Sequence, residues 1–195
     1  NVPRICYVNK MDRAGADFFK VMDQIREKLH ANPVALQLPI GAEDDFIGVV
    51  DLLRNKAYAW EEQDNGSVFD EIAIPDDMKD MVDEYRTRLV EGAVEDDEAL
   101  FEKYMDDPDS ITEADLIGQI RKATLDLRIC PVLCGSSFKN KGVQPLLDAI
   151  VNYLPSPLDI DHVKGVNPKT EQEEIRKADP KEPFCALAFK IATDP

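Results

Sequence analysis

The sequence lacks any apolar run that approaches the ~20 residues needed to cross a membrane. Its first residues, NVPRIC, also lack the basic, apolar and small-residue regions of a signal peptide. We therefore expect a cytoplasmic protein with no membrane partner. At 195 residues, with 44% apolar and 32% charged side chains, the chain is long enough to bury a core in one domain or in two small ones.

Cysteine and histidine are scarce. The sequence has four cysteines without a CxxC pair and two histidines, His30 and His162. A structural zinc site needs four clustered Cys or His ligands, so no metal site is predicted. Both histidines are expected at the surface rather than as acids or bases. The thiols all lie in apolar stretches and are expected to be buried and reduced, namely Cys6, Cys130, Cys134 and Cys185.

Negative charge is concentrated in one segment. Residues 40–125 contain 25 acidic and 8 basic side chains, a net charge of −17, whereas the whole chain has −16. Such a segment repels phosphate backbones, so we expect it to make no direct contact with nucleic acid. It suits a basic protein partner, or simply an exposed and solvated face. The sequence leaves both interpretations open.

Strand, loop and helix patterns flank the acidic segment on both sides. Apolar runs predict strands over 2–8, 34–38 and 129–133, and helical spacing predicts helices over 17–30 and 142–153. This order is typical of an α/β fold with an open, mostly parallel sheet that is interrupted by an insertion. We assign the sheet to residues 1–39 and 126–155, and an α+β insertion subdomain to 40–125.

The insertion and the C-terminal part have patterns of their own. Short strands are predicted over 46–53, 56–60 and 68–74, followed by a long helix after Pro75 and a short helix over 98–105. A capping box from Ser110 to Glu113 predicts a third helix. Residues 156–183 have the composition of a linker. A strand follows over 184–191, and because a lone strand is unstable we expect the chain to continue as a larger protein.

The loop after the first strand, Asn9-Lys10-Met11-Asp12, matches the pattern N-K-x-D. Guanine presents two adjacent donors, and the ionised carboxylate of Asp12 can accept both, whereas adenine places an acceptor there. The aliphatic stem of Lys10 can lie along the base, and Asn9 can join neighbouring loops while its amide reaches the base. Taken alone, the motif also fits an ordinary solvated turn.

A second loop, residues 134–139, also follows a predicted strand. Its small residues allow a backbone N–H to approach the guanine carbonyl, and Ser136 could steady the carboxylate of Asp12 by hydrogen bonding. The carboxyl ends of strands in an open sheet form the crevice where ligands bind. Two such loops together favour a guanine site over a chance turn.

Longer stretches around these loops resemble a known family. NVPRICYVNKMDRAGADF, NPVALQLPIGAEDDFIGVVDLL, CGSSFKNKGVQPLLDAIVNYLPSP and PFCALAFKIATDP are similar to consecutive parts of bacterial elongation factor G, a family of translational GTPases. The resemblance covers the whole chain and is weakest over 56–127. It implies an internal fragment that runs from the GTPase domain to the start of the second domain.

The resemblance implies residue roles, a fold and partners. Asn9, Lys10 and Asp12 would be the guanine-specificity motif for GTP or GDP, and Ser136, Ser137 and Phe138 the last nucleotide motif. Ser137 stands where the family usually has alanine. The fold would be a partial P-loop-NTPase sheet, whose insertion contacts the ribosomal stalk protein, and residues 184–195 would begin a β-barrel domain. The intact factor would drive GTP-dependent translocation of tRNA and mRNA on the ribosome.

Several motifs of such a GTPase are missing from the chain. It has no GxxxxGK[ST] loop and no catalytic histidine in a switch position. We therefore assign no catalytic residue, place the Mg²⁺ ligands of the intact protein outside this chain, and expect the chain alone to be inactive and to bind GTP weakly. Two alternatives remain, a sister translational GTPase such as a ribosomal-protection protein or release factor, and a non-enzymatic acidic protein-interaction module.

Overall fold

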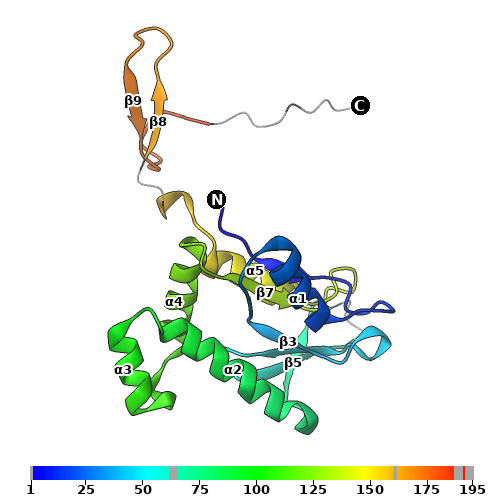
Figure 1. Ribbon diagram of the computed structural model, residues 1–195. Coiled ribbons are helices and arrows are strands. Elements are labelled where there is room, and N and C mark those ends of the chain that lie inside the picture. The colour runs from blue at the N-terminus through cyan, green and yellow to red at the C-terminus, as the bar shows by residue number, and fades with distance from the viewer. Residues whose placement is uncertain (1, 62–65, 160–161, 187–190, 192–195) are drawn as a thin grey trace. The chain divides into compact units, whose positions relative to one another are not determined.

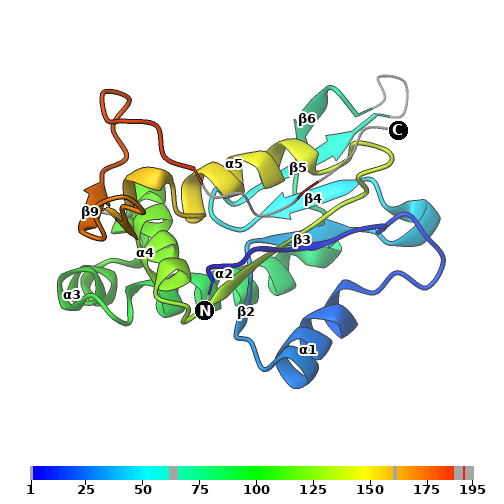
Figure 2. The ribbon, with the colours of Figure 1, turned by 90° about the horizontal axis from the view of Figure 1, so that it is seen from above.

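The computed structural model describes residues 2–61, 66–159, 162–186 and 191. The chain divides into two compact units, residues 1–154 and 155–195, and each is described by itself. The expected sheet segments and the insertion therefore pack together in the first unit. The described part of that unit contains one parallel and one antiparallel sheet (Figures 1 and 2). None of the helices in the described ranges is long and apolar enough to cross a membrane.

The parallel sheet has β7 at its centre. Its strands are ordered β1 (Cys6–Val8), β7 (Cys130–Cys134) and β2 (Pro33–Ala35). Both neighbours run parallel to β7, with Cys6 opposite Val132 and Pro33 opposite Cys130. All five residues of β7 are buried, as expected for a central strand covered on both faces. The predicted parallel sheet is confirmed.

Leu36 belongs to the hydrogen-bond ladders of both sheets. Its N–H donates to the Val132 carbonyl over 2.9 Å, and its own carbonyl accepts from Leu52 N–H over 3.0 Å. The strand predicted over 34–38 therefore spans the end of β2 and the start of β3. The antiparallel sheet continues from there as β3 (Gln37–Ile40), β4 (Gly48–Asp51), β5 (Lys56–Trp60) and β6 (Phe69–Ile72), paired in that order.

Helices cover both faces of the antiparallel sheet. Figure 1 shows α2 (Lys79–Val94) below β3 and β5, and α5 (Val143–Tyr153) above them. The predicted long helix begins at Lys79 because a 3-10 turn over Asp76–Met78 follows Pro75. The remaining helices are α1 (Phe18–Leu29), α3 (Glu98–Asp106) and α4 (Glu113–Leu125).

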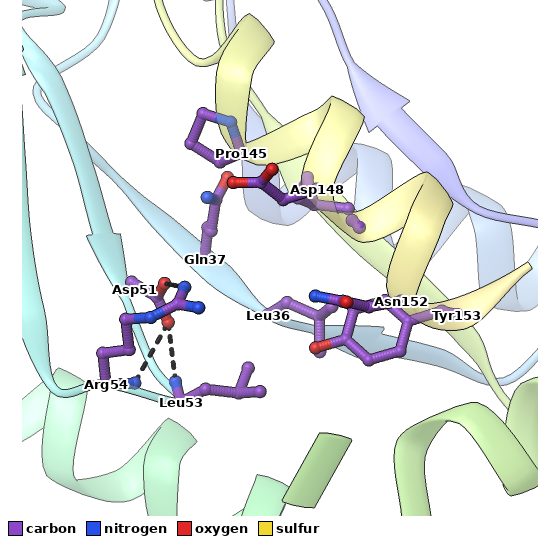
Figure 3. A pocket seen from close by; sticks show the side chains of 11 residues that line it. Leu36, Gln37, Asp51, Leu53, Arg54, Pro145, Asp148, Asn152 and Tyr153 are labelled. Atoms are coloured by element: carbon purple, nitrogen blue, oxygen red, sulfur yellow. Dashed lines mark hydrogen bonds and ion pairs between the residues drawn. The ribbon is translucent and has the colours of Figure 1, made fainter. Parts of the chain in front are cut away.

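A small cavity lies where α5 faces β3 and β4 (Figure 3). Its volume is about 30 Å³, and Gln37, Asp51, Asp148 and Tyr153 are among the residues that line it. The side chain of Gln37 is almost fully buried, and its Oε1 accepts no hydrogen bond from the described residues. A volume of this size holds roughly two water molecules, which would satisfy that oxygen. The cavity is too small for a nucleotide.

The capping box of α4 differs from the prediction by two residues. Thr112, not Ser110, caps the helix: its Oγ1 accepts from Asp115 N–H over 3.2 Å, and the Asp115 carboxylate accepts from Thr112 N–H over 3.0 Å. Ser110 instead lies in a 3-10 turn, and its hydroxyl donates to the Asp107 carbonyl over 2.6 Å. The sequence offers two possible capping boxes, Ser110 with Glu113 and Thr112 with Asp115. Because Ser110 lies in the preceding 3-10 turn, the helix begins after Thr112.

We expect Thr112→Ala to lower the free energy of unfolding by about 1 kcal/mol, because it removes the cap acceptor.

The hydrogen bond from Thr112 N–H, together with that from its hydroxyl, lowers the pKa of Asp115 to about 2. A lowered pKa stabilises the fold above the unfolded value of about 4 and loses that effect as pH falls toward the folded value. Asp115→Asn should therefore cost less stability at about pH 3 than at about pH 7.

Urea denaturation measures both effects. Thr87→Ala, an exposed position within α2, makes the same substitution without removing a cap, and should not destabilise. Equal losses for Thr87→Ala and Thr112→Ala would contradict the assignment of the cap.

The second unit corrects the linker prediction. Residues 156–183 contain an antiparallel hairpin of β8 (Val163–Val166) and β9 (Glu173–Arg176). Asn167 closes its turn, donating its N–H to the Gln172 carbonyl and accepting from Lys169 N–H through Oδ1. Of the strand predicted over 184–191, residues 184–186 adopt no strand, and residues 187–190 lie outside the described ranges.

The cysteines follow the prediction only in part. All four are free, and Cys130 and Cys134 are buried. Cys6 is only half-buried, with its Sγ 3.4 Å from the Sγ of Cys130 across neighbouring strands. Cys185 is exposed, as are Phe184 and Ala186 on either side of it, so the prediction of burial is wrong there.

Candidate functional site

Two loops meet at the carboxyl ends of β1 and β7. We define the first loop as residues 9–15 and the second loop as residues 135–141. Since β1 and β7 are neighbours in the parallel sheet, their following loops emerge side by side. Met11 N–H donates to the Gly135 carbonyl over 3.1 Å, and Gly135 N–H donates to the Val8 carbonyl over 3.0 Å. The structure thus joins the two loops that the sequence predicted to act together.

Asn9 is the main link between the loops. Its Oδ1 accepts from the N–H of Ser137 over 3.0 Å, from the Ser137 hydroxyl over 3.1 Å and from Lys10 N–H over 2.8 Å. These bonds use the carbonyl end of the side chain and leave its Nδ2 amine outside them. They also engage the N–H of Ser137, so that group does not reach a guanine carbonyl while the bond to Asn9 holds.

Asp12 is half-buried beside the second loop. The nearby Ser136 hydroxyl is the main cause that lowers the pKa of Asp12, against the opposing effect of burial, and Lys139 and Arg13 lower it further. The Ser136 Oγ is buried and completes no hydrogen bond of good geometry with the described residues. We therefore attribute its effect to a nearby dipole rather than to a formed bond. The carboxylate is ionised at neutral pH, as an acceptor of two guanine donors must be.

Left-handed backbone gathers around the loops. Lys10, Asn140 and Glu43 have positive φ values of 64°, 55° and 57°. Residues other than glycine rarely adopt this conformation, and such positions concentrate at functional sites. Lys10 is exposed, and Phe138 is 88% exposed, so both side chains are accessible to a ligand.

The second loop is packed too tightly for a side chain at Gly135. A Cβ there would lie 2.1 Å from the hydroxyl oxygen of Tyr7 and 2.3 Å from the Lys141 carbonyl oxygen. The Tyr7 hydroxyl donates to that carbonyl over 3.1 Å, and burial raises the pKa of Tyr7 to about 12. Lys141 also exchanges two backbone hydrogen bonds with Ser136. Sequence reasoning missed both Tyr7 and Lys141, since neither belongs to a recognised motif.

A cavity of about 380 Å³ borders the first loop and the start of α1. Its lining includes Asn9, Lys10, Arg13 and Lys20, and no residue of the second loop. Of the groups proposed to read the base, Asn9 and Lys10 line this cavity, whereas Asp12 does not.

The comparisons with known proteins agree with this arrangement. The family model of the elongation factor Tu GTP binding domain matches residues 1–156. The chain belongs to this family. The match includes both loops, and it confirms the predicted α/β fold of the P-loop-NTPase type.

Several relatives specify the resemblance further. Elongation factor G of Amoebophilus asiaticus is 60% identical over 194 residues, which is 100% of this chain and 27% of that protein. Elongation factor G of Cytophaga hutchinsonii is 56% identical, again over 100% of this chain and over 28% of its own length. A crystal structure of a protein from Thermus thermophilus superposes with a TM-score of 0.69 at 30% identity, covering 80% of this chain and 23% of the other. The predicted resemblance to elongation factor G is confirmed, and the chain spans about a quarter of these curated relatives.

The residues of the two loops fit a guanine base, because they combine an acceptor fork, an amide donor and an aliphatic stem. The family binds GTP through this domain. Within the described ranges, no cluster of three or more His, Cys, Asp or Glu side chains is placed to hold a metal ion.

Proposed function

We propose that this chain is the guanine-recognition part of a GTP-hydrolysing translation factor. The observation that carries the proposal is the pair of hydrogen bonds from Ser137 to Asn9 Oδ1, at 3.0 and 3.1 Å. They hold the loop that carries Asp12 against the loop that carries Ser136. This preorganisation favours binding of a base, because loops that are already held together lose little conformational entropy when the base binds.

Each residue of the loops has a chemical role in this proposal. The Asp12 carboxylate accepts from guanine N1–H and from the exocyclic amine, two charge-assisted bonds that adenine cannot make. The Nδ2 amine of Asn9 donates to a ring nitrogen of the base. Lys10 covers one face of the base with its aliphatic stem. The nearby Ser136 hydroxyl lowers the pKa of Asp12, and the stretch Ser137-Phe138 borders the carbonyl side of the base.

The function of the intact protein is proposed from its relatives. We infer GTP-dependent translocation of tRNA and mRNA on the ribosome, in the cytoplasm, with Mg²⁺ held by residues outside this chain. The names of the relatives support this, as does the sequence identity over the whole chain. The acidic insertion, residues 40–125, is the part that we propose to contact the ribosomal stalk protein. Its exposed acidic side chains on α2 support a protein partner rather than RNA.

Nucleotide selectivity of the full-length protein tests the proposal. We expect GDP to bind at least about 100-fold more tightly than ADP in equilibrium titrations, because ADP leaves the Asp12 carboxylate facing an acceptor. The isolated chain should neither hydrolyse GTP nor bind it strongly, since it lacks the residues that hold the phosphates. Equal affinity of the full-length protein for ADP and GDP would contradict guanine recognition. Micromolar GTP binding by the isolated chain would contradict the need for the missing residues.

A further inference from the structure

The first turn of the insertion contacts the first loop on both sides of Asp12. We define the insertion turn as residues 41–46. Glu43 N–H donates to the Met11 carbonyl over 2.8 Å, and the Glu43 carboxylate accepts from Gly15 N–H over 2.6 Å. Met11 precedes Asp12 directly, and Gly15 closes the loop before α1. One residue of the insertion thus fixes the backbone on either side of the carboxylate that reads the base.

The insertion turn has a fixed shape. Gly41 has a φ of 75°, and a Cβ there would lie 2.0 Å from the Asp45 carbonyl oxygen. Phe46 N–H donates back to the Glu43 carbonyl over 3.2 Å, and Glu43 itself has the positive φ noted above. Residues other than glycine rarely adopt this conformation, and they keep it only where their surroundings hold them in it. The two bonds to the first loop are part of what holds Glu43 there.

The same turn also holds the second loop. The Nζ of Lys141 donates to the Phe46 carbonyl over 3.2 Å, and Lys141 is only 5% exposed. A buried ammonium is costly unless it is hydrogen-bonded, so this contact is specific rather than incidental.

Gly66, which lies before β6, approaches the second loop as well. A Cβ at Gly66 would lie 2.4 Å from the Lys139 carbonyl oxygen, and Gln144 Nε2 donates to the Gly66 carbonyl over 2.9 Å. Gly66 and the insertion turn therefore both pack near the second loop, and the insertion turn also fixes the first loop.

We infer that the insertion turn is a positioning element of the guanine site. Its positioning residues are Glu43, which belongs to the turn, and Lys141, which binds the turn from the second loop. The Glu43 carboxylate binds the first loop through Gly15 N–H, and the Lys141 ammonium binds the insertion turn through the Phe46 carbonyl. They act through the loops, by fixing where the Asp12 carboxylate points and how closely the second loop approaches it. Guanine affinity then depends on the position of the insertion as well as on the base-reading residues. This inference rests on the proposed function.

The affinity ratio of GDP to IDP in the full-length protein tests the inference. Inosine lacks the exocyclic amine, so IDP cannot make the second bond to Asp12, and the ratio reports how well that carboxylate is aimed. Glu43→Ala removes the acceptor for Gly15 N–H. We expect it to weaken GDP binding by about tenfold, the effect of roughly one hydrogen bond to a charged group, and to weaken IDP binding less. The ratio should therefore fall.

Two substitutions in the same turn serve as controls. Glu43→Gln keeps an oxygen that can accept from Gly15 N–H, and should retain affinity within about threefold of wild type. Asp44→Ala removes a negative charge from the neighbouring exposed position and should change neither affinity.

Lys141→Met is a second test of the inference. It keeps the buried apolar stem and removes the bond to the Phe46 carbonyl, and it should lower the ratio of GDP to IDP affinity through the second loop.

The outcomes separate the inference from the proposed function. A wild-type GDP-to-IDP ratio in Glu43→Ala contradicts the inference, even if the yield of folded protein falls, because a purely structural loss does not change the affinities of the molecules that remain folded. Where Glu43→Ala does not fold, an unchanged ratio in Lys141→Met contradicts it equally. A wild-type protein that binds GDP, IDP and ADP alike contradicts guanine recognition itself, and the inference with it.

Discussion

Replacing Asp12 by Asn is expected to lower the affinity of the full-length protein for GDP by about two to three orders of magnitude. The substitution removes two charge-assisted acceptors and turns an N–H donor toward the guanine amine, and mismatches of this kind cost about 3–4 kcal/mol. The same amide matches xanthine, which has a carbonyl where guanine has an amine. XDP affinity should therefore rise in the variant while GDP affinity falls.

Equilibrium titrations with GDP and XDP, in the wild type and in Asp12→Asn, measure this exchange. Asp17→Asn is a suitable control: Asp17 lies close by in sequence, and its side chain caps α1 rather than facing the second loop. Because the pKa of Asp12 is lowered in the folded chain, wild-type GDP affinity should stay constant from about pH 8 to about pH 5 and fall only under more acidic conditions. A parallel loss of affinity for both nucleotides would contradict a role of Asp12 in reading the base.

Gly135→Ala is expected to have the second-largest effect. The added methyl group would lie 2.1 Å from the Tyr7 hydroxyl and 2.3 Å from the Lys141 carbonyl oxygen, and the latter is backbone that cannot turn aside. Such overpacking costs about 1–3 kcal/mol of folding free energy. The strain falls at the point where the second loop leaves β7, so the loop should move away from Asn9 and GDP affinity should fall at least about tenfold.

Denaturation and GDP titration of the same samples measure both consequences of Gly135→Ala. Gly118→Ala, within α4, provides the matched comparison because a Cβ there has no neighbour within 4 Å. It should stabilise the fold by about 0.5–1 kcal/mol, since alanine favours a helix interior, and leave GDP affinity unchanged. If Gly135→Ala kept full affinity and stability, the tight packing of the second loop against Tyr7 would be wrong.

The sequence was sufficient to predict the two loops and their adjacency. Each follows an apolar strand, and the N-K-x-D motif predicted that Asn9 joins neighbouring loops, as its bonds with Ser137 show. The role of Asp12 as the acceptor for guanine stays a prediction. The parallel sheet could be predicted too, because strand, loop and helix alternate on either side of the acidic segment. These patterns are local in the sequence, and the loops come together because the carboxyl ends of parallel strands lie at the same edge of the sheet.

The contacts of the loops with the rest of the chain were not predictable in this way. The bonds of Glu43 to residues of the first loop, and of Lys141 to Phe46, join residues far apart in sequence and depend on how the insertion folds back. The N–H of Ser137 was expected to face a base, but it donates to Asn9, a choice that only the loop geometry decides. The hairpin of β8 and β9 was missed because its strands are short and polar, although Asn167-Pro168 marks its turn.

The position of Leu36 has a consequence for engineering. Leu36 takes part in the hydrogen bonding of both sheets: its N–H donates to the parallel sheet, and its carbonyl accepts from the antiparallel sheet. The acidic segment, residues 40–125, therefore cannot be deleted and its flanking residues joined without disturbing the parallel sheet. Removing it would leave unpaired backbone along the inner edge of the nucleotide-binding fold, and a shortened version of this protein would need a new edge strand in its place.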